Sequence, residues 1–198
     1  MSDKFLELTL TDSVRAAQQY YYGLTSRVGS SSSIEKLSES EILFIESRDS
    51  MYLSTVSETG WPYVQHRGGA PGFLHVTSPT QLAFADFRGN RQLLSVGNLD
   101  ANDRLCLFLM DYPKRMRLKI LGHGRVEDAR ENPEHVAQLV TTAERHRVER
   151  IFHISVASFS WNCQQHITPR YSADEIRDAL VPLRKRIAEL EIQLKEEP

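Results

Sequence analysis

Apolar positions between residues 50 and 161 recur in short runs that are separated by turn residues. Residues 51–56 are β-branched and apolar, a Glu58-Thr59-Gly60 turn follows, and 62–67 resumes an extended pattern, which predicts a β-hairpin. Gly122 and Gly124 indicate a bulge or a close backbone contact in a later strand. The remaining strands are predicted at 73–76, 81–86, 104–110, 117–126 and 150–161.

Helical patterns are few and short in this region and before it. They are predicted at 14–22, 38–47, 90–96 and 133–145. Ser38 precedes Glu41 at the spacing of a capping box, and Pro133 stands where the first turn of a helix tolerates proline. A doubly wound parallel sheet needs a long helix after nearly every strand, so this order of elements favours an antiparallel barrel.

The last section of the chain, residues 173–196, has a different pattern. Its apolar residues recur every three or four positions, as on one face of a helix, and charges fill the other faces. Pro182 is expected to kink or restart this helix. The apolar stripe needs a partner, either the barrel or the same helix of a second subunit. We therefore divide the chain into an N-terminal helical segment (1–47), a barrel domain (48–170) and a C-terminal amphipathic helix (171–198).

Composition and charge narrow the class of protein. The chain has 198 residues, of which 40% are hydrophobic, and a formal net charge of −2, so no overall attraction to nucleic acid or anionic lipid is expected. Residues 1–10 lack the basic and apolar regions of a signal peptide, and no run approaches the length of a membrane-spanning helix. We expect a cytoplasmic protein with neither a nucleic-acid nor a membrane partner.

Two polar clusters at strand ends offer groups that bind anions. Residues 65–72 hold Arg67 and three glycines, and glycine lets the backbone approach a ligand closely. A loop that only turns the chain explains this cluster equally well. Residues 85–92 combine glycine, asparagine and two arginines at a strand-to-helix junction, which is typical of phosphate binding. A solvated basic turn is the alternative for this second cluster.

Two further clusters give weaker signals. Arg117 and Lys119 share one face of a basic strand and either point at the same anion or are solvated. Residues 161–167 place Trp161 before amides and an imidazole, which suits a flat heteroaromatic ligand, but a capped loop with a buried tryptophan is the alternative. The seven histidines show no HExxH or CxxC-type spacing, so no metal site is predicted. Nucleophile-elbow, P-loop and GxGxxG motifs are also absent from the sequence.

In their order along the chain, these clusters resemble the FMN-binding split-barrel family related to pyridoxamine 5′-phosphate oxidase. The resemblance spans about residues 38–167 and rests on three stretches, which read YLSTV…GWPYVQHRGG, FADFRGNRQ and WNCQQH. It implies a mainly β (α+β) fold, an antiparallel split β-barrel with flanking helices and a C-terminal helix. It also implies a homodimer with an FMN site shared between the two subunits.

The resemblance further implies which residues form that site. One subunit would supply residues along the flavin ring and ribityl chain, residues that line the cofactor, and residues that hold the phosphate. In that order they are Arg67, Gly68 and Gly69; Ala85 and Asp86; and Asn90 and Arg91, supported by Arg88 and Gln92. The residues that the second subunit would supply are Arg117, Trp161, Gln165 and His166.

The function implied is hydride or electron transfer at the flavin, with a small molecule that the sequence does not identify. The oxidase ends in an arginine- and histidine-bearing strand segment that grips pyridoxal phosphate, whereas this chain ends in the helix at 173–196. We therefore expect a different substrate, and we assign no catalytic side chain. A carrier or sensor that holds flavin or haem without turnover is the alternative, and an interaction protein whose barrel binds nothing is a third.

Overall fold

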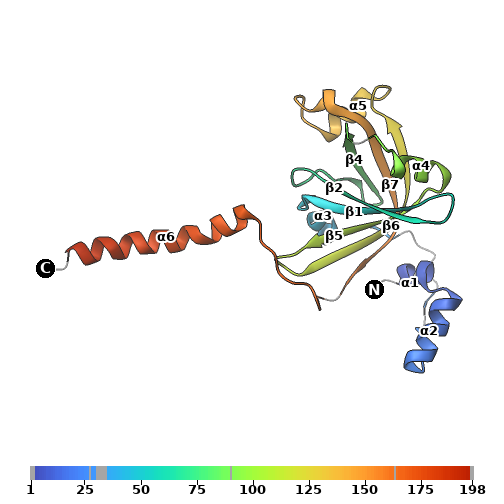
Figure 1. Cartoon of the computed structure of the whole chain (residues 1–198), viewed down its shortest axis with the longest axis horizontal. Helices are drawn as coiled ribbons and strands as arrows, with labels where there is room; N and C mark the ends of the chain where they lie inside the picture. The colour runs from blue at the N-terminus through green and yellow to red at the C-terminus, as the bar shows by residue number, and fades with distance from the viewer. Residues whose placement is uncertain (1–2, 27, 30–34, 90, 163, 197–198) are drawn as a thin grey trace. The chain divides into compact units, whose positions relative to one another are not determined.

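The computed structural model describes residues 3–26, 28–29, 35–89, 91–162 and 164–196 (Figure 1). The chain forms two compact units. The first consists of residues 1–110 and 117–163, and the second of residues 111–116 and 164–198.

One seven-stranded antiparallel sheet organises the first unit (Figure 1). Its strands follow one another in the order β2-β1-β5-β6-β7-β4-β3. Their bounds are β1 (Ser50–Val56), β2 (Pro62–Gly68), β3 (His75–Ser78), β4 (Gln81–Phe87), β5 (Arg104–Asp111), β6 (Met116–Asp128) and β7 (Val148–Trp161). The predicted hairpin is confirmed, because Met51 of β1 pairs with Arg67 of β2 and Val56 pairs with Pro62.

The sheet curls without closing, and β2 and β3 are its edges. Arg67 of β2 forms an ion pair with Asp86 of β4, although β1, β5, β6 and β7 lie between these two strands in the sheet order. Such a contact requires strong curvature, as in a barrel with a gap. The predicted mainly β, split-barrel architecture is therefore confirmed.

The interior of the curled sheet is filled by alternate residues of its strands. Burial alternates along β5, and Phe84 of β4 stacks on Phe152 of β7 with ring centroids 4.8 Å apart. The predicted bulge in β6 is confirmed between Leu121 and Gly122. A Cβ atom on Gly122 would lie 2.7 Å from the carbonyl oxygen of Ser155, so this position requires glycine for close approach of two backbones.

Short helices accompany the sheet. They are α1 (Asp3–Thr9), α2 (Asp12–Tyr22), α3 (Glu39–Glu46), α4 (Leu94–Ala101), α5 (Pro133–Leu139) and the 3-10 helix η1 (Arg145–Arg147). The predicted capping box at the start of α3 is present. α4 packs against β1 and β2, and α5 packs against β4 and β7, so these two helices lie beside the strands that carry the polar clusters.

Most predicted boundaries agree with the structure to within two residues, and three differ in ways that have a local cause. The helix expected at 90–96 begins at Leu94, because Leu93 adopts a left-handed conformation with φ 56°. The strand expected from Phe73 begins at His75, since Phe73 donates its N–H to the carbonyl of Ala70 in a turn. The helix expected at 133–145 ends at Leu139.

The second unit contains the helix α6 (Ala173–Glu196). Of the two effects expected at Pro182, the restart is wrong, because α6 continues through this residue as one helix. The residues of the apolar stripe whose side chains are described are all exposed: Ile176, Leu180, Leu183, Ile187 and Leu190. Among the described residues, none of the helices combines the length and apolar character needed to cross a membrane.

Candidate functional site

Three adjoining cavities follow the ends of β2 and β4, and together we call them the β2–β4 cleft. Their volumes are about 170, 200 and 430 Å³. The first and second share Arg67, Asp86 and Phe87 in their walls, and the second and third share Gly68, Phe73, Ala85 and Phe87. The cleft is thus lined by the polar clusters that end these two strands.

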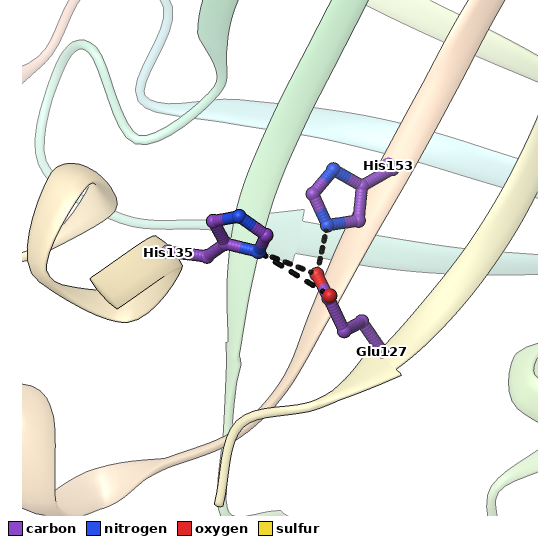
Figure 2. Close-up of side chains that lie close together, drawn as sticks. All are labelled: Glu127, His135 and His153. Atoms are coloured by element: carbon purple, nitrogen blue, oxygen red, sulfur yellow. Dashed lines mark hydrogen bonds and ion pairs between the residues drawn. The ribbon is translucent and has the colours of Figure 1, made fainter. Parts of the chain in front are cut away.

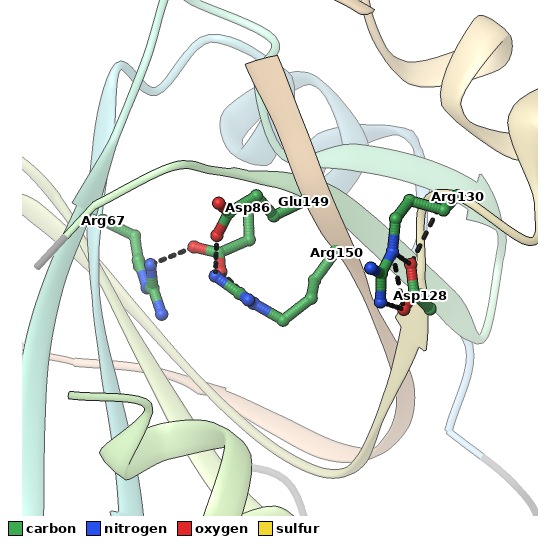
Figure 3. A network of polar contacts seen from close by, with 6 residues as sticks. All are labelled: Arg67, Asp86, Asp128, Arg130, Glu149 and Arg150. Carbon is green, nitrogen blue, oxygen red and sulfur yellow. Dashed lines mark hydrogen bonds and ion pairs between the residues drawn. The ribbon is translucent and has the colours of Figure 1, made fainter. Parts of the chain in front are cut away.

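A network of charged side chains forms one wall of the β2–β4 cleft (Figure 3). Asp86 is buried and accepts hydrogen bonds from the guanidinium groups of both Arg67 and Arg150, the latter at 2.8 Å. Asp86 and Arg150 are cross-strand partners in β4 and β7, which fixes their contact. Burial acts to lower the pKa of Arg150, but its bonds to Asp86 and Glu149 outweigh this and raise it.

Arg67 is held in place more firmly than a surface arginine. Its guanidinium carbon lies 5.3 Å from the ring centroid of Phe152 and 5.9 Å from that of Phe84. Its Nε is buried and has no hydrogen-bond partner within the described part of the chain. A buried donor without an acceptor costs free energy, which a ligand in the adjoining cavity would recover by accepting that hydrogen bond.

The beginning of α4 forms another part of the wall of the first cavity. Leu93, Leu94, Ser95 and Val96 line it together with Arg91. Ser95 donates its hydroxyl to Gln65 Oε1 at 3.0 Å, and the side-chain amide of Asn98 donates to Thr55 Oγ1 at 2.9 Å. These bonds hold α4 against β2 and β1. Because the first amides of a helix have no intrahelical acceptor and carry partial positive charge, this wall suits an anion.

A fourth cavity of about 540 Å³ shares Arg91, Leu93 and Arg150 with the first. Asp128 and Arg130 in its wall form a pair with Nη2–Oδ2 2.5 Å apart (Figure 3). The hydrogen bonds from Arg130 lower the pKa of Asp128 to about 2. The pair therefore stays ionised at neutral pH and adds no net charge to the region around Arg91.

The structure brings most of the residues assigned to the first subunit into one place. The β2–β4 cleft is lined by Arg67, Gly68, Gly69, Ala85, Asp86, Arg91 and Gln92. Arg88 follows β4 and donates its backbone N–H to the carbonyl of Arg147, and it is not in the walls described. Asn90 lies outside the described residues.

The residues assigned to the second subunit lie elsewhere in this chain. Trp161, at the end of β7, donates its indole N–H to Glu41 at 2.7 Å and packs against Phe44. Arg117 has a buried Nε with no partner among the described residues. Gln165 and His166 belong to the second unit. None of these residues lines the cavities of the β2–β4 cleft.

Several residues of the cleft were not predicted from the sequence. Tyr63 and Gln65 alternate with Arg67 along β2, and strand periodicity was a sufficient signal to place them on the same face. Ser95 lies in the first turn of α4, and it was not predicted because the helix was expected to begin at residue 90. Arg150 required knowledge of the pairing between β4 and β7, which the local sequence does not contain.

The chain is similar to proteins of a known family. A family model described as pyridoxamine 5′-phosphate oxidase matches residues 41–162, which is more than half of the chain. No curated protein matches the sequence.

The solved structures that resemble this one include the following two. A Lactobacillus delbrueckii protein described as a candidate pyridoxamine 5′-phosphate oxidase is 17% identical with a TM-score of 0.50, over 64% of this chain and 94% of that chain. Group A Streptococcus HupZ is 11% identical with a TM-score of 0.49, over 68% of this chain and 100% of that chain. At 17% identity the first likeness supports the fold alone. On the match of the family model, the chain belongs to the pyridoxamine 5′-phosphate oxidase family.

Proposed function

We propose that this protein binds FMN in the β2–β4 cleft and transfers hydride or electrons between the flavin and a small molecule. Flavin binding is common in the family to which the chain belongs. The observation that carries the proposal is the buried Nε of Arg67, which has no acceptor among the described residues. It lies in a side chain that lines the same cavity as Arg91 and the start of α4.

The charges in the first cavity suit a phosphate. Arg67 and Arg150 share the single carboxylate of Asp86, and Glu149 accepts a further bond from Arg150 at 2.9 Å. Arg91 adds a positive charge next to the helix start. A phosphate monoester placed there gains charge-assisted hydrogen bonds from Arg91 and the amides of α4, with Arg88, Asn90 and Gln92 close by in the sequence.

The other two cavities suit a flat ring. They are lined by Gly68 and Gly69, which have no side chains to obstruct a ligand, and by the apolar side chains of Ala85, Phe73 and Phe87. The 430 Å³ cavity has the more apolar wall of the two, and a mostly apolar wall with a few polar groups is typical of sites for cofactors. The ring would lie along the end of β2, with Arg67 between ring and phosphate.

Bound FMN would supply the hydride and electron transfer, and the protein supplies binding and orientation. Asp86 and Arg150 position Arg67, since both of the carboxylate oxygens are engaged by the two guanidinium groups. The guanidinium is held beside the cavity before the cofactor binds, so it loses little conformational freedom on binding. We assign no side chain as a nucleophile or general base.

A homodimer completes the proposed site. Tyr52 of β1 pairs with His66 of β2 and Phe108 of β5, and Val64 extends the same outward face, on which Tyr52 and Val64 are exposed. Burial of this apolar face against a second copy would remove it from water. In this dimer Arg117, Gln165 and His166 of the second copy reach the flavin, and Gln165 or His166 hydrogen-bonds the ring edge. Trp161 contributes its ring, since its N–H is already donated to Glu41.

Titration of the purified protein with FMN tests the proposal. We expect saturable binding of one FMN per chain, seen as quenching of flavin fluorescence. Arg91→Ala and Arg67→Ala should each weaken binding by more than about tenfold, because each removes a charge-assisted bond. Arg104→Ala, an exposed arginine at the start of β5, is the matched control and should bind normally. Absence of FMN binding, or unchanged affinity of both variants, contradicts the proposal.

The same preparation distinguishes an oxidoreductase from a carrier. An oxidoreductase that uses a nicotinamide cofactor loses its flavin absorbance when NADH or NADPH is added without oxygen, and regains it with the acceptor. A protein that holds flavin only as a carrier or sensor stays oxidised. A Soret band on addition of haem, together with no binding of FMN, would show that the cofactor is haem and not flavin.

A further inference from the structure

Three potential metal ligands meet at a place separate from the charged network of Arg67 and Asp86. Glu127 of β6, His135 of α5 and His153 of β7 point toward one another (Figure 2). His153 Nε2 lies 2.5 Å from Glu127 Oε2, and His135 Nδ1 lies 3.1 Å from the same oxygen. One ligand atom from each residue lies within 4.8 Å of the other two.

The fold holds these side chains in position. Glu127 pairs with Ile151, and Arg125 with His153, so Glu127 and His153 are diagonal neighbours on one face of the β6–β7 ladder. That face also carries Ile151, and Val136 of α5 belongs to the same buried cluster as Ile151. His135 is adjacent to Val136, so the packing of α5 brings its ring over the carboxylate. The three groups therefore come from three elements that are already fixed by the fold.

The cluster has the chemistry and the spacing of a zinc site. Two imidazoles and one carboxylate form a ligand set that Zn²⁺ uses in proteins. Ligand atoms about 2.0–2.1 Å from a tetrahedral zinc ion lie about 3.3 Å apart, and small side-chain rotations bring the observed nitrogen and oxygen atoms to that spacing. The side chains are 14–40% exposed, so an ion can enter from solvent.

We propose that Glu127, His135 and His153 bind one Zn²⁺ ion, with water in the fourth position. The ion would cross-link α5 to β6 and β7. Leu139 of α5 lines the largest cavity of the β2–β4 cleft, and its carbonyl lies 2.9 Å from His75 Nε2 of β3. Bound zinc would therefore stabilise one wall of that cavity without contacting the proposed flavin. The proposal does not depend on flavin binding.

One cation competes with the metal. Arg125 Nη1 lies 4.0 Å from Glu127 Oε2, but the arginine side chain is 65% exposed and is free to turn into solvent when a metal neutralises the carboxylate. Without metal, the three groups form a hydrogen-bonded anchor between the same elements. A zinc site and a metal-free anchor are distinguished by whether the purified protein binds zinc, which can be measured directly.

Zinc titration of the full-length, tag-free protein tests this inference. We expect one Zn²⁺ per chain in competition with a chromogenic chelator, and a melting temperature that rises with zinc concentration. Glu127→Gln and His153→Asn should each lower the zinc affinity by more than about 100-fold. Loss of a residue that only supports a metal ligand already costs about 10–100-fold, and loss of the ligand itself costs more. His123→Asn is the control, since His123 is exposed and its ring hydrogen-bonds Asp103 rather than a residue of the cluster.

Cobalt gives a second, spectroscopic measurement. Co²⁺ bound by nitrogen and oxygen in a four-coordinate site gives visible absorption, which we expect for the unaltered protein and the His123→Asn control, and not for Glu127→Gln. The circular dichroism of each zinc-free variant shows whether it is folded. Failure of the unaltered protein to bind zinc, or equal zinc affinity in Glu127→Gln and the unaltered protein, overturns the inference. FMN titration of the same samples reports separately on the proposed function.

Discussion

Trp161 donates its indole N–H to Glu41 Oε1 at 2.7 Å, and its ring packs edge-on against Phe44 with the centroids 4.7 Å apart. The end of β7 is thereby joined to α3, which begins eleven residues before β1. Glu41 also accepts hydrogen bonds from the backbone N–H and the hydroxyl of Ser38. One buried carboxylate thus both caps a helix and connects it to the sheet.

This carboxylate should make stability depend on pH. Burial of Glu41 acts to raise its pKa, but the hydrogen bonds from Ser38, Trp161 and Ser40 outweigh burial, so the pKa lies below its ordinary value. The ionised form therefore stabilises the folded state above the unfolded pKa of about 4.3, and this contribution is lost as the pH falls through the lower, folded pKa. Glu41→Gln should lower stability by about 1 kcal/mol at neutral pH.

Melting temperatures measured from about pH 3 to about pH 7 check this expectation. The difference between the unaltered protein and Glu41→Gln should be largest at neutral pH and should shrink toward the acid end. Glu39→Gln in the same helix is the matched control, because Glu39 is exposed. A constant difference between Glu41→Gln and the unaltered protein at every pH would show that ionisation of Glu41 is not the cause.

Removal of the carboxylate between Arg67 and Arg150 should destabilise the barrel. Asp86→Ala leaves two largely buried guanidinium groups next to each other without their shared anion, and we expect a loss of about 2–4 kcal/mol. Urea unfolding measures this loss. Asp103→Ala removes an exposed partner of His123 and should cost less than about 1 kcal/mol. Equal losses in the two variants would mean that burial of the network has no energetic consequence.

Much of this fold follows from local sequence patterns. The β-branched, apolar run at 51–56, the turn after it and the extended pattern at 62–67 are enough to predict the β1–β2 hairpin. The Ser38–Glu41 spacing is enough to predict the start of α3. The start of α4 was predicted too early because Leu93 adopts a left-handed conformation. Leucine seldom does so, and the local sequence therefore gives no sign of it. Proline at position 182 lies inside α6, against the general rule.

The candidate sites show where local patterns stop. Arg67 and the 85–92 cluster stand out because each ends a strand, and the curl of the sheet brings them together in one cleft. Glu127, His135 and His153 match no metal-binding motif, since they lie 8 and 18 residues apart and meet only through strand register and helix packing. Sequence spacing therefore gave no reason to expect a metal there.

The outward face of β1 and β2 should determine the oligomeric state. Val64→Glu places a charge at the centre of the proposed dimer contact, and we expect the variant to be a folded monomer with weak FMN affinity. Light scattering coupled to size-exclusion chromatography gives the mass, and circular dichroism gives the fold. Val14→Glu alters an exposed valine of α2 and should leave the dimer intact. A Val64→Glu variant that is still dimeric would place the contact on another surface.

Two glycine-to-alanine substitutions should act in opposite directions. A Cβ atom at Gly122 would lie 2.7 Å from the backbone oxygen of Ser155 and 3.0 Å from Ile154 Cγ2, so Gly122→Ala must move one strand of the β6–β7 ladder and should cost about 1–3 kcal/mol. A Cβ atom at Gly97 in α4 meets no atom within 4 Å, so Gly97→Ala should stabilise the helix by about 0.5–1 kcal/mol.

Urea unfolding of both glycine variants gives the two values on one scale. Because α4 forms a wall of the first cavity, Gly97→Ala should also retain FMN affinity or improve it, since a more rigid helix start binds an anion with less loss of conformational freedom. A stable Gly122→Ala variant would mean that the bulge at Leu121 and Gly122 relaxes without disturbing β7. A destabilised Gly97→Ala variant would mean that α4 packs more tightly against β1 and β2 than the open space at position 97 indicates.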